Sequence, residues 1–302
     1  MAPFFFTQTV AIFCSAAPSV AEIKTVLEGY DVQDFSTSPD VDLQVNMIGL
    51  SQVIISLKLS RWPDHMGSPE TESRTFMQWS MGLFGGGAWP GALERAVRRC
   101  NHPDLVAAVR EHQVYFLVRM KIHINSEGAI PDELDEGRDF PCLLKICARL
   151  LQLPGTSFFN PNSEILLLSL PEEDSPAFPL EALHSRRFSG IREGWLLAHS
   201  LGNAQLGLPD LEIVCRRDDF SDVEIKEWLA STTRNILPGL ELKDGVKIPS
   251  PKGDLWALKC LEKGFHDTPP RPVIRLTQPG DKLPAIWKSG VYRRPWWRFW
   301  QT

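Results

Sequence analysis

The chain has 302 residues and an apolar fraction of 43%, which is normal for a globular protein with one large or two ordinary domains. Its formal net charge of −5 argues against a general nucleic-acid binder, which would present a basic field, and permits a basic partner. No apolar run is long enough to span a membrane. The apolar run Phe4–Ala17 has no Lys or Arg before it, so it predicts a first strand and not a signal peptide.

The six cysteines predict buried, reduced thiols in a cytoplasmic protein. None of them forms a C-x-x-C pair, so the usual signal of a zinc site is missing. Most of them lie inside apolar, periodic segments, which favours packed thiols over a disulfide framework. They are Cys14, Cys100, Cys142, Cys147, Cys215 and Cys260.

The N-terminal part of the chain alternates strand and helix patterns. Strands are expected at Phe4–Cys14, Val32–Phe35, Gln52–Ser60 and Val114–Ile124. Helices are expected to begin near Ser19, Glu72, Pro90 and Pro103. The first of these helices has capping-box spacing between Ser19 and Glu22 and a terminating glycine at Gly29. The glycine cluster Gly82–Gly87 lacks the Gly-Lys-Ser/Thr ending of a phosphate loop, so it predicts a turn with close backbone packing.

A polar stretch at residues 125–139 is expected to be an exposed loop and the domain boundary. After it the pattern predicts a helix that ends before Pro154, a hairpin around Asn160–Asn162, and a Pro- and acid-rich segment from Pro171 to Pro179. Trp195–Leu201 is expected to be helical. A turn that contains Gly202 and Gly207 is expected next, followed by a strand that ends at Cys215 and a helix that begins at Ser221. Further strands are expected at Leu255–Leu261 and Val273–Leu276.

Two helix openings fit one pattern, S-x-x-E-I-K-x-x-L, at Ser19–Leu27 and Ser221–Leu229. Each follows an apolar strand that ends in a cysteine, so the pattern predicts an internal structural repeat. The expected fold class is α+β, with two ferredoxin-like β-α-β-β halves, additional helices and mainly antiparallel sheets. The expected division is an N-terminal half 1–125, an acidic linker 126–139, a C-terminal half 140–280 and an Arg/Trp-rich tail 281–302.

No catalytic constellation stands out, and no metal site or cofactor is expected. The seven histidines are scattered, without H-E-x-x-H or paired metal-ligand spacing, and no G-x-S-x-G elbow is present. The residues of the turn before Cys215 are expected to be structural, with Asp210 accepting backbone N–H bonds. They are Gly202, Gly207, Pro209 and Asp210. The alternative is an enzyme or ligand-binding domain with a pocket near Gly202–Asp210.

The stretch Leu201-Gly202 followed by Leu206-Gly207-Leu208-Pro209-Asp210 resembles the signature of an uncharacterised bacterial domain family. Further similar pieces lie at Gly91–Ala96, Leu153–Gly155 and Lys243–Gly245, but Ala198-His199-Ser200 replaces the more usual acidic segment before the signature. In length and composition the chain also resembles immunity proteins of type VI secretion toxin–immunity pairs. That resemblance implies a cytoplasmic inhibitor without catalysis of its own, whose partner is a nuclease toxin.

Two acidic clusters are candidates for binding that toxin, because nucleases that grip a phosphate backbone present basic surfaces. The alternative is that both are solvated loops. The candidate residues are Asp132, Glu133, Asp135, Glu136 and Asp139 in the first cluster, and Glu172, Glu173 and Asp174 in the second. The Arg/Trp tail is expected to pack on the body of the protein. The alternatives for this tail are stacking on bases or contact with a membrane surface.

Overall fold

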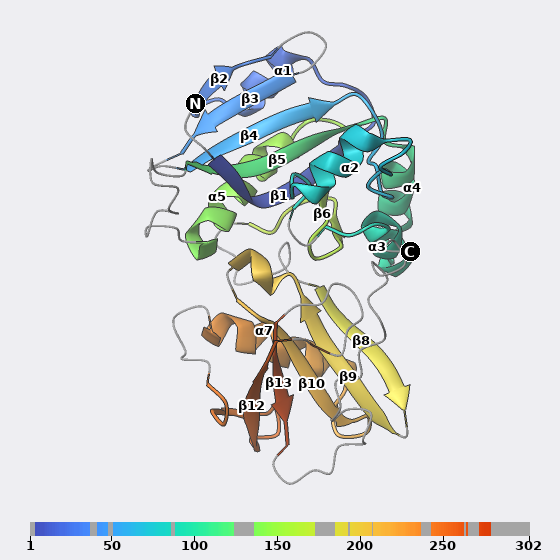
Figure 1. The fold of residues 1–302 in the computed structure, drawn as a ribbon, viewed down its shortest axis with the longest axis vertical. Coiled ribbons are helices and arrows are strands. Elements are labelled where there is room, and N and C mark those ends of the chain that lie inside the picture. The colour runs from blue at the N-terminus through green and yellow to red at the C-terminus, as the bar shows by residue number, and fades with distance from the viewer. Residues whose placement is uncertain are drawn as a thin grey trace. The chain divides into compact units, whose positions relative to one another are not determined.

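The computed structural model describes residues 4–36, 41–47, 51–85, 88–123, 136–172, 185–192, 194–206, 208–236, 243–262, 264 and 272–278. Side chains are described for these residues except 4–7, 51, 122–123, 136–139, 185–192, 204 and 206. The chain forms two compact units, Met1–His184 and Ser185–Thr302 (Figure 1). Among the described helices, none combines the length and apolar character that crossing a bilayer requires.

The first unit is built on a seven-stranded sheet with the order β2-β3-β4-β5-β1-β6-β7, in which every neighbouring pair is antiparallel. Its strands are β1 Phe4–Cys14, β2 Asp31–Asp34, β3 Val41–Asn46, β4 Ser51–Lys58, β5 Val114–His123, β6 Thr156–Asn160 and β7 Ile165–Leu167. Its helices are α1 Val20–Val26, α2 Ser73–Ser80, α3 Ala92–Arg99, α4 Pro103–Glu111 and α5 Glu136–Leu150.

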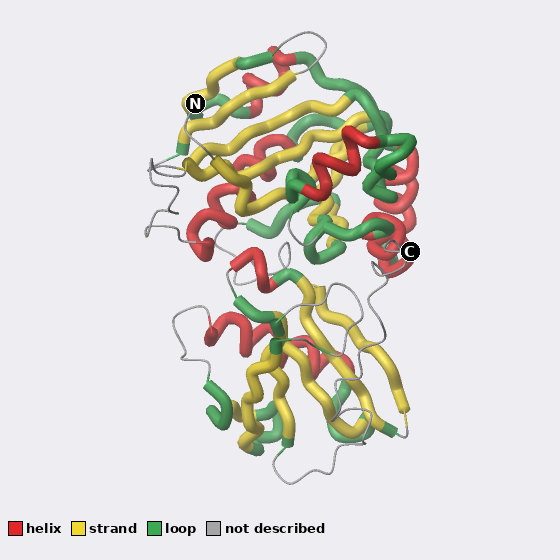
Figure 2. Tube along the Cα trace, in the orientation of Figure 1, coloured by secondary structure: helices red, strands yellow, loops and turns green. Residues whose placement is uncertain are grey.

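The central strands of this sheet are buried on both faces, as the continuous apolar run of β1 predicted. Ala11 and Phe13 face the cluster that contains α3 and α4, while Val10 and Ile12 are also fully buried on the opposite side. Figure 2 shows helices on both faces of this sheet. Helix α5 packs against β1, β5 and α1, and its apolar stripe is completely buried. The sheet is therefore the middle layer of a three-layer unit.

The second unit is built on a six-stranded sheet with the order β11-β12-β13-β10-β9-β8. Strand β10 is parallel to β13, and the other neighbouring pairs are antiparallel. Its elements are β8 Ser185–Arg192, β9 Trp195–Leu201, the 3₁₀ turn η1 Asn203–Leu206, β10 Asp210–Arg216, α7 Asp222–Ile236, β11 Lys247–Pro249, β12 Leu255–Leu261 and β13 Val273–Thr277. Helix α7 covers one face of the sheet through a core that includes Phe220, Trp228 and Trp256.

Both predicted capping boxes are present. At the start of α1 the Ser19 backbone N–H donates to Glu22 Oε2 at 2.7 Å, and the Glu22 N–H donates to Ser19 Oγ at 3.2 Å. At the start of α7 the corresponding bonds join Ser221 and Glu224 at 2.8 and 3.2 Å. These bonds satisfy helix N–H groups that have no partner within the helix, and they lower the pKa of both glutamates.

The division into units differs from the expected one at residues 126–139. Helix α5 packs on β1 and β5, and β6 pairs with β1 at Ala11↔Phe159, so the residues up to β7 complete the first unit. The polar stretch was a misleading signal because the chain returns to the same sheet after it.

The prediction of a helix at Trp195–Leu201 is also wrong. All seven residues of β9 are buried. A short, mostly apolar run has no clear polar side to reveal a period of 2 or of 3.6, so the sequence pattern cannot tell a strand from a helix.

The coarser fold prediction, a mixed α+β protein with mainly antiparallel sheets, is confirmed. In both units a strand leads to a capped helix and then to a three-stranded meander, β2–β4 in the first unit and β11–β13 in the second. The last meander strand runs parallel to the first strand in each case. In the second unit β13 lies beside β10, whereas in the first unit β5 lies between β4 and β1. The sheets thus have more strands than a four-stranded ferredoxin-like half.

Candidate functional site

The turn that contains Gly202 and Asp210 is held together by buried side-chain hydrogen bonds. Asp210 is 1% exposed, and its Oδ1 accepts from Ser200 Oγ at 3.0 Å and from the Asn203 backbone N–H at 3.1 Å. Ser200 Oγ in turn accepts the Leu211 N–H at 2.8 Å. The expectation that Asp210 accepts a backbone N–H bond is confirmed.

The same turn is joined to α7. The Asn203 amide donates to Pro209 O at 3.2 Å and to Thr233 Oγ1 at 3.3 Å, so the turn and the last part of the helix share one buried polar cluster. Gly202 has a positive φ of 121°, which favours glycine. Gly207 lies outside the described residues. Because these groups bond to one another, we assign the turn a structural role. The turn lines neither the cavity beside α7 nor the one beside Cys14.

A buried ion pair lies on the face of the second sheet that is opposite α7. Arg275 donates to Glu212 Oε2 from Nε at 3.1 Å and from Nη2 at 2.8 Å, and the two side chains are 7% and 1% exposed. His199 is opposite Glu212 in the register of β9 and β10 and is fully buried. His199 is therefore a packed histidine, and it lies in a strand and not in the helix expected at Trp195–Leu201.

The two acidic clusters fall mostly outside the described residues. This holds for Asp132, Glu133, Asp135, Glu173 and Asp174, and also for the Arg/Trp tail 281–302. Glu136 and Asp139 lie in the backbone of α5, so the end of the expected loop is helical. Glu172 is exposed. The structure therefore leaves the role of these carboxylates as a prediction.

An apolar surface forms around α2, which has no fully buried residue. Met77 and Met81 are 57% and 69% exposed and are four residues apart, so they are neighbours on one helix face. Phe76, Trp79 and Trp89 are half-buried around the same helix, with ring centroids 5.7 Å apart for Phe76–Trp79 and 6.3 Å for Trp79–Trp89. We call these five residues the α2 surface.

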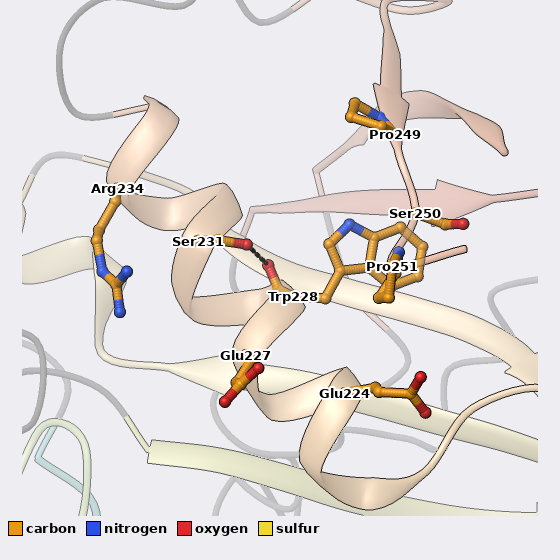
Figure 3. A pocket seen from close by; sticks show the side chains of 8 residues that line it. All are labelled: Glu224, Glu227, Trp228, Ser231, Arg234, Pro249, Ser250 and Pro251. Atoms are coloured by element: carbon orange, nitrogen blue, oxygen red, sulfur yellow. Dashed lines mark hydrogen bonds between the residues drawn. The ribbon is translucent and has the colours of Figure 1, made fainter. Parts of the chain in front are cut away.

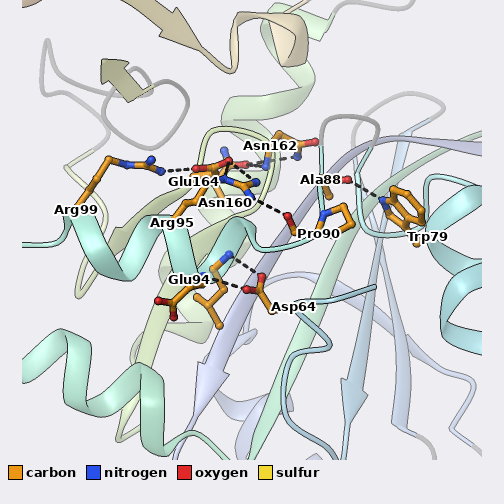
Figure 4. Close-up of polar contacts among 11 residues, drawn as sticks. Asp64, Trp79, Ala88, Pro90, Glu94, Arg95, Arg99, Asn160, Asn162 and Glu164 are labelled. Carbon is orange, nitrogen blue, oxygen red and sulfur yellow. Dashed lines mark hydrogen bonds and ion pairs between the residues drawn. The ribbon is translucent and has the colours of Figure 1, made fainter. Parts of the chain in front are cut away.

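The loop that follows α2 is fixed by polar contacts (Figure 4). Trp79 Nε1 donates to Ala88 O at 2.7 Å, which orients the indole ring of the α2 surface. Gly85 has a positive φ of 101°, and a Cβ at this position would lie 2.6 Å from Asn162 Oδ1. The predicted close backbone packing in the glycine cluster is therefore confirmed at Gly85.

Asp64 caps α3 from a distant turn. Its two carboxylate oxygens accept the backbone N–H groups of Leu93 at 2.7 Å and Glu94 at 3.0 Å, and its carbonyl accepts the Gly91 N–H at 2.7 Å. The helix has glycine at its own N-cap position and no side-chain cap there, so Asp64 takes that role. Burial raises the pKa of the Asp64 carboxyl, while the two backbone bonds act in the opposite direction.

An ion-pair network ties α3 to the β6–β7 hairpin. Arg95 donates to Pro90 O at 2.7 Å and to Glu164 Oε1 at 2.9 Å, and Arg99 forms a second ion pair with the same carboxylate. The Glu164 side chain is only 6% exposed and its φ is +56°. Asn162 adds a bond from Nδ2 to Thr9 O at 3.0 Å. The aromatic side chains of the α2 surface therefore rest on a rigid support.

A groove of about 420 Å³ lies between α7 and the turn after β11 (Figure 3). Helix α7 lines it with Glu224, Glu227, Trp228, Ser231 and Arg234. These positions follow helical spacing and form one stripe along the helix. The opposite wall is Pro249, Ser250 and Pro251, in a turn closed by the bond from Ser250 N–H to Asp254 O at 2.7 Å.

Three polar groups of this groove have no partner within the described part of the chain. Trp228 is 4% exposed, and its Nε1–H makes no hydrogen bond. Glu227 and Arg234 are exposed and take part in none of the ion pairs found there. A buried donor without an acceptor costs about 1–3 kcal/mol. The groove therefore offers a carboxylate and a guanidinium to a ligand.

No group of three His, Cys, Asp or Glu side chains in the described ranges is placed to hold a metal ion. All six cysteines are free thiols, and burial raises the pKa of Cys14 and Cys215 to about 12. Sequence reasoning missed both the α2 surface and the groove. The only early signal for either was the concentration of Trp, Phe and Met at residues 76–89.

Comparison of the chain with protein-family models, with curated proteins and with solved structures gives no match.

Proposed function

We propose that the protein is a stoichiometric inhibitor, an immunity factor that binds and neutralises a cognate toxin by direct contact. The observation that supports this proposal best is the α2 surface, where Met77 and Met81 are more than half exposed on one face of the helix and three aromatic rings are half-buried around it. Trp, Tyr, Phe and Met are enriched at the buried centres of protein interfaces, and truncating such anchors removes most of the binding energy.

The rigid support under this surface favours tight binding. Side chains that are already held in place lose less conformational entropy when a partner arrives. Trp79 is fixed by Ala88 O, and the loop behind it is fixed by Asp64 and Arg95. Flexible methionines at the rim adapt to the partner, which is how methionine acts at other binding surfaces.

The electrostatic part of the proposal concerns the partner and its compartment. The chain has a net charge of −5, and a nuclease toxin of a type VI secretion system would carry a basic surface. Carboxylates at Glu172 and in the acidic segment 132–139 would then steer association and raise its rate. We place the protein in the cytoplasm, where its six free thiols stay reduced.

We also propose that the two units descend from one ferredoxin-like β-α-β-β element. Shared order of strand, capped helix and meander supports this, as does the position of Cys14 and Cys215 at the ends of β1 and β10. The alternative function, catalysis or ligand binding at Gly202–Asp210, has no specific support, because the polar groups of that turn bond to one another.

The test is binding to the purified product of the neighbouring toxin gene, measured by calorimetry with the full chain. We expect a one-to-one complex. The double variant Met77→Ser/Met81→Ser should weaken it roughly thirtyfold or more, as loss of about 2 kcal/mol at a hot spot implies. Leu168→Ser is the matched control, because Leu168 is 44% exposed and lies at the end of β7. Unchanged binding by the double variant would move the interface away from α2. Absence of any complex would refute the proposed function.

A further inference from the structure

The α7 groove differs from the α2 surface in its chemistry. The α2 surface is apolar, whereas the groove combines two proline rings and an indole with opposite charges at its two ends. Glu227 and Arg234 are seven residues apart on α7, which places them about 10 Å apart along the helix axis. Neither carboxylate nor guanidinium has an ion-pair partner among the described residues.

The spacing of these charges matches an extended peptide. A polyproline II segment rises about 3.1 Å per residue with three residues per turn, so side chains at positions i and i+3 lie about 9 Å apart on the same side. A basic side chain at one position would therefore reach Glu227, and an acidic side chain three positions away would reach Arg234. Such a segment has no internal hydrogen bonds, so its carbonyl groups remain free to accept.

The indole ring of Trp228 forms part of the groove wall. Trp228 lies between Glu227 and Ser231 in the stripe and lines the groove, and its nitrogen has no acceptor in the described part of the chain. Figure 3 shows the ring between α7 and the Pro249–Pro251 wall. Its ring position is fixed by Trp256, with centroids 5.0 Å apart at an interplanar angle of 89°. The prolines add a rigid apolar wall that donates no backbone hydrogen bond.

We propose that this groove binds an extended segment of a partner protein that carries a Lys or Arg and, three positions away, an Asp or Glu. Glu227 pairs with the basic side chain and Arg234 pairs with the acidic one, and the ligand lies beside the Trp228 ring. The inference rests on the proposed function in one respect, namely that the ligand is a protein. The recognition chemistry belongs to the second unit alone.

The test uses labelled synthetic peptides and the full chain, with binding followed by fluorescence anisotropy at low salt. The probe is the capped peptide P-R-P-P-E-P, in which the charges have the required spacing. Its controls are P-R-E-P-P-P, with the same composition and adjacent charges, and the neutral P-Q-P-P-Q-P. We expect the first peptide to bind at least roughly threefold more tightly than either control, as one or two exposed ion pairs allow.

Variants then locate the site. Glu227→Gln should remove the preference for the first peptide, whereas Glu111→Gln, the same exchange at the exposed last residue of α4, should leave it unchanged. The indole N–H resonance of Trp228, assigned with Trp228→Phe, should shift when the peptide binds beside the ring. This signal is read from the wild-type protein and is independent of any effect of the phenylalanine variant on packing.

Equal affinity for the three peptides, or a preference that survives Glu227→Gln, would overturn the inference. An indole resonance that stays in place would overturn the position of the peptide beside Trp228. These results are separate from those for the proposed function. A toxin complex without peptide selectivity would leave the α2 proposal intact and refute the groove, and peptide selectivity without a toxin complex would do the reverse.

Discussion

Replacing Asp210 by alanine tests how the connection between β9 and β10 is held together. The side chain is 1% exposed and accepts from Ser200 Oγ and from the Asn203 N–H. Alanine leaves both donors buried, and each buried donor without a partner costs about 1–3 kcal/mol. Because the Ser200 hydroxyl can rotate to another acceptor, we expect a loss of about 3 kcal/mol in the unfolding free energy of the second unit. This exceeds the roughly 1 kcal/mol that is typical of an exposed cap.

Urea unfolding followed by tryptophan fluorescence measures this loss, since Trp195, Trp228 and Trp256 report on the second unit. Asp210→Asn keeps one acceptor oxygen and should fall between the wild type and the alanine variant. Asp218→Ala removes an exposed carboxylate from the following turn and should change the free energy by less than about 0.5 kcal/mol. If Asp210→Ala unfolds like the wild type but no longer binds the toxin, the structural assignment is refuted and the turn is a contact site.

Three further perturbations test other buried polar groups. Glu212→Gln should cost about 3–5 kcal/mol because the Arg275 guanidinium is left buried, and Glu212→Leu/Arg275→Met should recover most of it, both measured by urea unfolding. His112 accepts the Trp62 N–H, and burial lowers its pKa. Its contribution to stability should therefore be complete above about pH 6.5, the ordinary histidine value, and decline as the pH falls below it, a dependence that His112→Gln should reduce. Asp64→Ala should cost about 1–2 kcal/mol and raise amide exchange in the first turn of α3.

Local signals in the sequence predicted the local structure well. Both capping boxes, the helix that begins after Glu72 and the strand over Leu255–Leu261 lie where the patterns placed them. In the strand expected at Gln52–Ser60, Val53, Ile55 and Leu57 are buried on one face, whereas Leu59, which continues their alternation, is 56% exposed because β4 ends at Lys58. These features depend on residues within a few positions of one another, where helix-start chemistry and side-chain period are direct physical causes.

The features that failed depend on pairing over long sequence distances. Asp64 caps a helix whose donating N–H groups are 29 and 30 residues away, and Arg95 meets Glu164 across 69 residues. No local period encodes such contacts. The boundary was misplaced for the same reason, since the return of β6 to β1 spans more than a hundred residues of intervening chain and leaves no trace in the composition of 125–139. The α7 groove likewise needs the turn at Pro249–Pro251 to fold back beside the helix.

The difference between the two units bears on where binding surfaces arise. In the second unit β13 pairs directly with β10, so the last strand of the strand–helix–meander element lies next to its first strand. In the first unit β5 separates β4 from β1, and the connection from β4 to β5 contains α2, α3 and α4. The α2 surface thus belongs to a segment that has no counterpart among the described residues of the second unit. A sheet tolerates such an insertion because β5 pairs antiparallel with both neighbours and so satisfies the backbone groups of each. The shared element then accounts for the fold of each half, and the inserted segment accounts for the surface that we assign to the toxin.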